Sequence, residues 1–285
     1  GAQKLCSGWR PRYCGIIPSV VPSLCSFERV FYIMTTPHTT DSHTKTLMER
    51  LFAVGAHFGF TKSRRHPTAT PFIFGNRQGT DIIDLEKTIA SLDTAKALVK
   101  ELGKAGKTIL FVGTKEEMIT TVKGSALSVE MPYVVNRWVG GMLTNFSEIK
   151  KRIQRLHELT SQGESGELER KYTKKERVII GREHAKLMHN FSSIAKMERM
   201  PSALIVVDPR HDAIAVKEAR ELNIPVIGIT SSDTNIRLIN YPIVVNDALQ
   251  ASVALILAEL ASAYIAGKSE FVPQQKREEA RKNDR

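Results

Sequence analysis

Short, continuously apolar runs separated by helical segments constrain the fold of this chain more than any other feature. The runs are TILFV (108–112), YVV (133–135), ALIVV (203–207) and PVIGI (225–229). Such runs are typical of parallel strands that are buried on both faces. A helical segment, Ala213–Leu222, separates the last two. This alternation predicts an α/β fold with a mostly parallel sheet and helices on both faces.

The region before these strands contains shorter extended segments and a predicted helix. PFIF (71–74) and DIID (81–84) are predicted to be short extended segments. The next segment, 85–102, has apolar residues at helical spacing and predicts a helix. A further helix is predicted over 115–128, after a turn at Gly113.

Between Asn145 and Met200 charged helical segments replace the strand pattern. Two helices are predicted at about 146–161 and 173–199, joined by the polar turn SQGESGEL at 161–168. Each has a narrow apolar stripe that can face the other. The stripe residues are Ile149, Ile153, Leu156 and Leu159 on the first helix, and Val178, Leu187, Phe191 and Ile194 on the second. The sequence therefore predicts a helical hairpin that projects from the sheet domain.

The run RWVGGMLTNF, at 137–146, matches no common enzyme motif. Its two adjacent glycines allow positive φ or close approach to another surface. The Thr-Asn pair that follows is suited to capping a helix that begins near Phe146. A tight cationic turn that leads into a helix suits contact with a phosphate backbone. The alternative is a glycine turn packed beneath Trp138.

This run resembles a signature of the small-subunit ribosomal protein S2 family, of bacterial or organellar type. Four further segments resemble family strings and occur in the family's order. They are HFGFTKSRRHPTATPFIFGNRQGTDIIDLEKT (57–88), KTILFVGTKEE (107–117), PSALIVVDPRHDAIAVKEARELNIPVIGI (201–229) and YPIVVND (241–247). Together they cover about residues 46–267. The resemblance implies a Rossmann-like (flavodoxin-like), doubly wound sheet with a coiled-coil hairpin inserted at about 146–199.

The chain departs from the family pattern at several positions. Phe60 stands where the family usually has a second His after His-Phe-Gly, and His66 stands where it usually has Trp. The family's Asp-Thr-Asn after the late strand falls on Ser-Ser-Asp at 231–233, and the Pro that follows is Ile236. The contacts that these positions make in the family are therefore open in this chain.

By resemblance, the chain is expected to be a non-catalytic structural constituent of the small ribosomal subunit, with no cofactor. It would bind small-subunit rRNA and other small-subunit proteins, including the mRNA-binding ribosomal protein S1, on the back of the subunit between head and body. The expected location is the cytoplasmic ribosome, or an organellar ribosome if the N-terminal leader is a transit peptide. A net charge of +11 and a pI near 9.6 agree with a polyanionic partner.

The candidate RNA contacts fall in a proline-broken loop and in the segment around the glycine turn. Arg and Lys on loops and helix starts bind phosphates and position a protein without reading bases. Trp138 is a candidate for stacking on an unpaired base or for packing in the core. The candidates are Lys62, Arg64, Arg65, His66 and Arg77 in the loop, and Arg137, Trp138, Asn145, Lys150, Lys151, Arg152 and Arg155 around the turn.

Two enzyme-like motifs fail on spacing. Gly-Lys-Thr at 106–108 resembles the end of a phosphate-binding loop but lacks the earlier Gly and precedes a strand rather than a helix. Glu-His at 183–184 with His189 lacks the four-residue His spacing of a zinc helix. These segments predict neither a nucleotide site nor a metal site.

The motif DPRHD, at 208–212, leaves an alternative function open. Asp208 ends a strand, where open α/β sheets usually bind ligands. Asp208 and Asp212 are also suited to capping the next helix, which is the preferred interpretation. The alternative is a small-molecule-binding α/β enzyme that uses Asp208 and the Gly113 turn.

The two ends of the chain differ from its body. All three cysteines lie in the first tenth, so the body contains no disulfide and suits a reducing compartment. A disordered leader is predicted at 1–45, of which 1–33 would be untranslated if synthesis starts at Met34, and a charged disordered tail at 268–285. No apolar run approaches the roughly 20 residues of a membrane span, so no membrane partner is expected.

Overall fold

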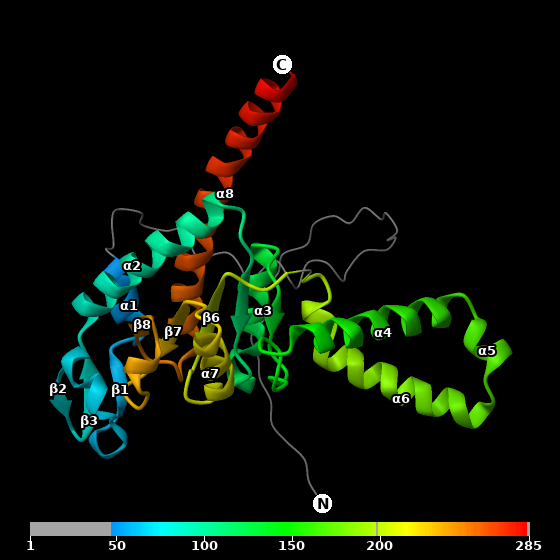
Figure 1. Cartoon of the computed structure of the whole chain (residues 1–285). Helices are drawn as coiled ribbons and strands as arrows, with labels where there is room; N and C mark the ends of the chain where they lie inside the picture. Colours follow the sequence, from blue (N-terminus) through cyan, green and yellow to red (C-terminus); the bar gives the residue numbers. More distant parts are fainter. Residues whose placement is uncertain (1–46, 198, 284–285) are drawn as a thin grey trace, which may run out of the picture. The chain divides into compact units, whose positions relative to one another are not determined.

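The computed structural model describes residues 47–197 and 199–283. By its internal contacts the chain divides into two units, Gly1–Thr44 and Lys45–Arg285. The leader predicted at 1–45 lies outside the described residues. All described helices and strands belong to the second unit (Figure 1).

Five parallel strands form the main sheet, in the order β5-β4-β6-β7-β8. Chain order runs outward from β4 in both directions, which makes the sheet doubly wound. The α/β, Rossmann-like prediction is therefore confirmed. The strand bounds are Ile109–Val112 (β4), Tyr133–Val134 (β5), Ala203–Val207 (β6), Val226–Thr230 (β7) and Tyr241–Val244 (β8).

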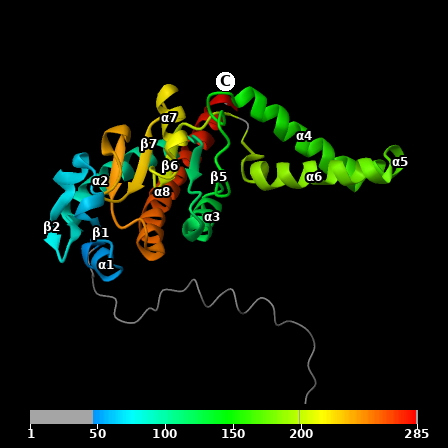
Figure 2. The ribbon, with the colours of Figure 1, turned by 90° about the horizontal axis from the view of Figure 1, so that it is seen from below.

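Helices cover both faces of the main sheet. The bounds are Leu85–Lys104 (α2), Ile119–Ser128 (α3) after a short η3 (Glu116–Met118), Ala213–Glu221 (α7) and Gln250–Asn283 (α8). Side chains alternate along a strand, so Ile109 and Phe111 of β4 pack with α2, α3 and α8. Leu110 and Val112 pack on the opposite side, with α7. Figure 2 shows α7 on one side of the strands and α3 with α8 on the other.

A small antiparallel sheet lies beside β8. Its strand order is β1-β3-β2, and the bounds of this region are Leu47–Ala53 (α1), Phe58–Thr61 (β1), Lys62–Arg64 (η1), Pro67–Phe72 (η2), Ile73–Arg77 (β2) and Thr80–Ile83 (β3). The Asn246 amide donates to the Ala56 carbonyl (3.0 Å), and the Thr88 hydroxyl donates to the Val244 carbonyl (2.7 Å). These bonds tie the small sheet and α2 to the edge of the main sheet.

The predicted helical hairpin is present, with α4 (Phe146–Glu164) and α6 (Lys174–Phe191) side by side and a short α5 (Glu167–Lys171) at the tip (Figures 1 and 2). Two details of the prediction are wrong. The second helix ends at Phe191 rather than near 199, because η4 (Ser192–Ile194) turns Ile194 into the core. Val178 is 56% exposed and does not join the stripe that faces α4.

Helix α8 is the core helix of the second unit. Its window Gln250–Glu270 is long and apolar enough to cross a membrane by length and composition. In the structure 44% of that window is buried. Val253, Ile256 and Leu260 are fully buried in the core that also contains α2 and α3.

Helix α8 continues to Asn283 in the structure, through the segment that the sequence predicts to be a charged tail at 268–285. Residues 274–283 are QQKREEARKN, which are mostly strong helix formers. Extending an existing helix costs far less free energy than nucleating a new one.

Candidate nucleic-acid interface

The glycine turn before α4 encloses a buried carboxylate, that of Glu218 from α7. Gly141 has a φ of 83°, a conformation that glycine adopts without strain. Trp138 Nε1 (3.1 Å) and the Gly141 amide (2.8 Å) donate to Oε1 of Glu218. The amides of Leu143 (3.0 Å) and Thr144 (3.3 Å) donate to Oε2. The run that stands out in the sequence is thus folded around one acceptor.

The electrostatics of Glu218 follow from these donors. Burial alone would raise its pKa, but the hydrogen bonds from Trp138 and from the backbone of the turn outweigh burial, so the pKa is lowered. A charged Glu218 therefore ties α7 to the turn that leads into α4.

Two predictions at this turn need correction. Trp138 is 8% exposed, packs in the core beneath α7 and donates its indole N–H to Glu218, so it does not stack on RNA. Asn145 occupies the N-cap position of α4, but its side chain makes no capping bond. Its Oδ1 accepts a hydrogen bond from Ser147 Oγ instead (3.4 Å). Asn145 is exposed and stays a candidate RNA contact.

Four exposed or half-buried cations of α4 form, together with Arg137 and Asn145 of the preceding turn, what we call the hairpin surface. Its residues are Arg137, Asn145, Lys150, Lys151, Arg152 and Arg155. Arg137, Lys150, Lys151 and Arg152 are exposed, and Arg155 is half-buried. Arg137 and Arg152 form no ion pair with any residue that the structure describes.

Part of the hairpin surface lines a groove of about 350 Å³ between α4 and α6, to which Lys151, Arg152 and Arg155 contribute. Two glutamates in the groove offset some of the positive charge. Lys151 Nζ lies 2.7 Å from Glu148 Oε1, and Arg155 Nε lies 3.7 Å from Glu183 Oε1. Arg152 and Lys186 line the same groove without an ion pair to any described residue, so both can bind an anion there.

A second group, the loop surface, consists of Lys62, Arg64, Arg65, His66 and Arg77 around the small sheet. Arg64 lies over the ring of Phe60, 5.4 Å from its centroid. Arg65 faces the fully buried Asp81, with 3.6 Å between Nη1 and Oδ1. Lys62 and Arg77 are exposed and have no ion-pair partner among the described residues. Arg65 therefore has a structural partner, while Lys62, Arg64 and Arg77 remain available for a ligand.

The two surfaces lie at opposite edges of the main sheet. The hairpin surface follows β5, and the loop surface belongs to the small sheet beside β8. The structure therefore gathers the predicted residues into two sites rather than one.

The carboxyl edge of the main sheet holds the residues of the alternative enzyme hypothesis. Asp212 accepts hydrogen bonds from the amide (3.2 Å) and hydroxyl (2.7 Å) of Thr114, and burial raises its pKa. It stands at the N-cap of α7 but makes no capping bond with its side chain, contrary to the capping prediction. Asp208 accepts from the His211 amide (3.3 Å) and lies 3.7 Å from Lys115 Nζ. The described residues contain no group of three or more side chains placed to hold a metal ion.

Comparison with known proteins accounts for both the fold and the motifs. The family described as Ribosomal protein S2 matches residues 51–267. The chain belongs to the ribosomal protein S2 family. Relatives named small ribosomal subunit protein uS2 include that of Nocardia farcinica, 45% identical over 220 residues, which are 77% of each chain. The protein of Parabacteroides distasonis is 41% identical over 241 residues, 83% of this chain and 86% of its own.

The departures from the ribosomal protein S2 pattern meet at one place. The Phe60 amide donates to Ser232 Oγ (3.0 Å), and the His66 amide donates to the Ser232 carbonyl (2.9 Å). His66 Nδ1 also lies 2.8 Å from Thr68 Oγ1. Phe60 and His66 therefore both bond to Ser232, and the Phe60 ring faces Arg64 of the loop surface.

Sequence reasoning missed Glu218 and Asp81, the two buried carboxylates that hold the candidate surfaces in place. A signal for Glu218 was present, because it lies on the face of α7 that also contains the buried Ala215 and Ala219. A charged residue on an apolar stripe indicates a buried partner. Asp81 lies in a short strand of four residues, and its partner Arg65 lies in a loop without a regular pattern. The sequence therefore contains no sign that the two pair.

Proposed function

We propose that the chain binds small-subunit rRNA through phosphate contacts from the loop surface and the hairpin surface. As a member of the ribosomal protein S2 family, it is a structural constituent of the small ribosomal subunit and has the subunit's RNA and proteins as partners. The proposed domain is 46–267, and it contains both surfaces, the hairpin at about 146–199 included.

One observation carries the proposal, namely exposed cations that are mounted on a fixed frame and left without ion pairs. Among described residues, Lys62, Arg64 and Arg77 on the loop surface and Arg137 and Arg152 on the hairpin surface have no acidic partner. Cations that neutralise RNA phosphates release counterions, which favours binding at low salt. The frame matters because a backbone that is already folded loses little entropy on binding, so the cost is confined to the cationic side chains.

The test is the salt dependence of binding between the full chain and a transcript of small-subunit rRNA. Each phosphate contact that is removed should reduce the slope of log K against log salt by roughly one unit. We expect this reduction for Arg64→Ala and for Arg137→Ala. The matched control is Lys123→Ala, an exposed cation on α3 outside both surfaces. The proposal would be wrong if the slope of log K against log salt were the same for all three variants.

We infer that the chain has no catalytic activity, because it belongs to a family of structural ribosomal proteins and its strand-end aspartates have partners within the fold. Asp212 is held by Thr114, and Asp208 lies near Lys115. The enzyme alternative requires a turnover that Asp208→Ala abolishes.

The finer partner and location follow from the family resemblance. We infer that ribosomal protein S1 binds to this chain and that the ribosome is cytoplasmic, or organellar if the leader is a cleaved transit peptide. Mass spectrometry of salt-washed small subunits from the source tests both inferences. We expect this chain in stoichiometric amount with an N-terminus at Met34, and loss of S1 from subunits depleted of this chain. A cleavage site upstream of Met34 would indicate an organelle.

A further inference from the structure

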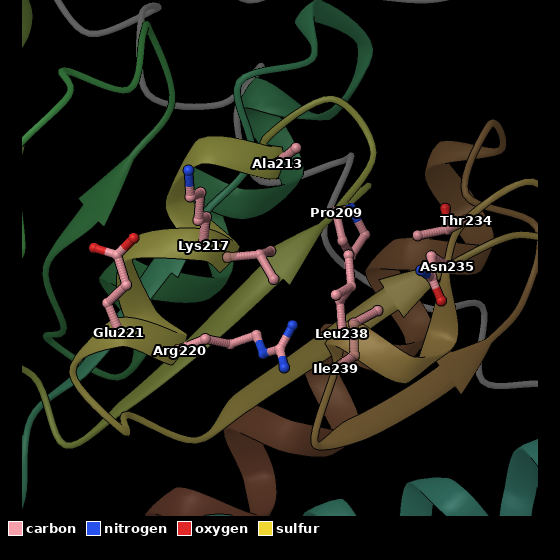
Figure 3. Close-up of a pocket in the computed structure, with 10 residues that line it drawn as sticks. Pro209, Ala213, Lys217, Arg220, Glu221, Thr234, Asn235, Leu238 and Ile239 are labelled. Atoms are coloured by element: carbon pink, nitrogen blue, oxygen red, sulfur yellow. The ribbon is translucent and has the colours of Figure 1, made fainter.

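An open apolar groove lies between α7 and the loop that carries η5 (Ile236–Leu238), with a volume of about 570 Å³ (Figure 3). Pro209, Val216 and Ile239 form its buried part, and Ala213 and Leu238 stand at its sides. Neither the loop surface nor the hairpin surface contributes a residue to it.

The packing on strand β7 explains why the groove is open. A Cβ atom on Gly228 would lie 2.9 Å from Ile239 Cδ1 and 3.0 Å from Pro209 Cγ. Pro209 and Ile239 therefore pack directly on the strand backbone, and the space between α7 and η5 above them is unfilled. Leu238 is left 40% exposed at the side of the groove, although Ile239 beside it is buried.

The charge around the groove is positive. Figure 3 shows the guanidinium of Arg220 reaching from α7 toward Leu238 and Ile239, whereas the carboxylate of Glu221 points away. Lys217, Arg220 and the neighbouring Arg237 are exposed and form no ion pair with any described residue. Glu221 is the single acid among the lining residues. A ligand that complements this groove has an apolar group and a negative charge.

We propose that the groove binds an acidic amphipathic segment of a neighbouring protein. An aliphatic or aromatic side chain of that segment enters between Val216 and Leu238, and a carboxylate pairs with Arg220. Amphipathic helices dock into apolar grooves of this kind, with charges at the rim that select the partner. RNA fits less well, because the groove is lined by aliphatic rather than aromatic side chains, and unpaired bases stack mainly on aromatic ones. This proposal does not depend on the rRNA contacts proposed above.

The probe is a fluorescein-labelled helical peptide with leucines on one face and glutamates on the other, titrated with the full chain and followed by fluorescence anisotropy. A second peptide carries lysine at every glutamate position. Leu238→Asp removes the apolar wall of the groove. Its matched control is Leu222→Asp, a leucine that is 39% exposed and does not line the groove. Arg220→Glu reverses the charge, and Lys123→Glu is its control on α3.

We expect the acidic peptide to bind saturably and Leu238→Asp to weaken it about tenfold, the effect of a central interface residue. Arg220→Glu should weaken the acidic peptide and strengthen the lysine peptide, while both controls leave the affinities unchanged. The proposal is overturned if neither peptide binds, if the lysine peptide binds the native chain equally well, or if each variant matches its control. It is also overturned if Leu238→Asp and Arg220→Glu weaken binding to the rRNA transcript instead, since the groove would then belong to an RNA interface.

Discussion

At the scale of single residues, the turn before α4 depends on Glu218. Glu218→Ala would leave the indole N–H of Trp138 and three backbone amides of the turn without their acceptor. Since each buried donor left unsatisfied costs about 1–3 kcal/mol, we expect the free energy of unfolding to fall by at least about 3 kcal/mol. Urea denaturation at pH 7 measures this loss. Glu221→Ala, an exposed position of the same helix, should change it by less than about 0.5 kcal/mol.

The pH dependence of the same residue gives an independent check. The pKa of Glu218 is lowered in the folded state, so its charge stabilises the fold above the unfolded pKa of about 4.3. This contribution is lost as the pH falls through the folded pKa. The stability difference between the native chain and Glu218→Gln should therefore shrink below about pH 4. A difference that stays constant from pH 7 to pH 3 would contradict the role of the charge.

Asp247 is expected to behave in the opposite way. Burial, together with the charge of Asp208, raises its pKa to about 7, and its Oδ1 has no hydrogen-bond partner among described residues. Because the folded state holds this proton more tightly than the unfolded state, with a pKa of about 3.9, stability falls as the pH rises from about 4 to 7. Asp247→Asn should abolish this fall and be more stable at pH 8, by on the order of 4 kcal/mol.

Thermal unfolding between pH 4 and pH 8 tests the expectation for Asp247. The control is Asp93→Asn, an exposed position on α2, which should keep the native pH profile. If Asp247→Asn is less stable than the native chain at pH 8, its carboxylate has a favourable partner and the expectation is wrong.

At the scale of elements, the crossing of α2 and α8 depends on two glycines. A Cβ on Gly103 would lie 2.6 Å from the Tyr264 carbonyl oxygen, and one on Gly267 would collide with the Lys100 carbonyl. Both obstacles are backbone atoms, which move only if the helices separate. We therefore expect Gly267→Ala to lower the free energy of unfolding by about 1–3 kcal/mol.

A matched glycine separates this packing effect from helix propensity. Gly181 of α6 is also helical, but a Cβ there meets open space. Gly181→Ala should raise stability by up to about 1 kcal/mol, because alanine is the better helix former. Chemical denaturation of the two variants decides the matter. If Gly267→Ala and Gly181→Ala change the free energy of unfolding by the same amount, the close approach of α2 and α8 does not contribute to stability.

The sequence predicted most elements because their signals are local. The runs at 108–112 and 203–207 are continuous and apolar, and the structure makes them the central strands β4 and β6. The contacts that define the candidate surfaces join distant segments, such as Glu218 with Gly141 or Arg65 with Asp81. The local sequence pattern of one segment does not identify the distant segment that it will contact. From the sequence alone Trp138 is a candidate for stacking on RNA for the same reason, because its buried partner Glu218 is distant in the sequence.

At the scale of the whole molecule, the doubly wound sheet separates the two basic surfaces. One chain can therefore hold two RNA elements apart at a fixed spacing, which is useful in a structural constituent of a ribosomal subunit. Two contacts on one partner act together, so binding depends on both far more strongly than on either surface alone.

The additivity of the salt effect distinguishes such a bridge from a single binding site. The double variant Arg64→Ala/Arg77→Ala and the double variant Arg137→Ala/Arg152→Ala should each lower the salt slope by roughly two units, and the quadruple variant by roughly four. Effects at distant, independent sites add. The charge-matched control is Lys107→Ala/Lys123→Ala, two exposed cations outside both surfaces. If the quadruple variant behaves like one of the doubles, only that surface touches RNA, and the other serves a different partner in the subunit.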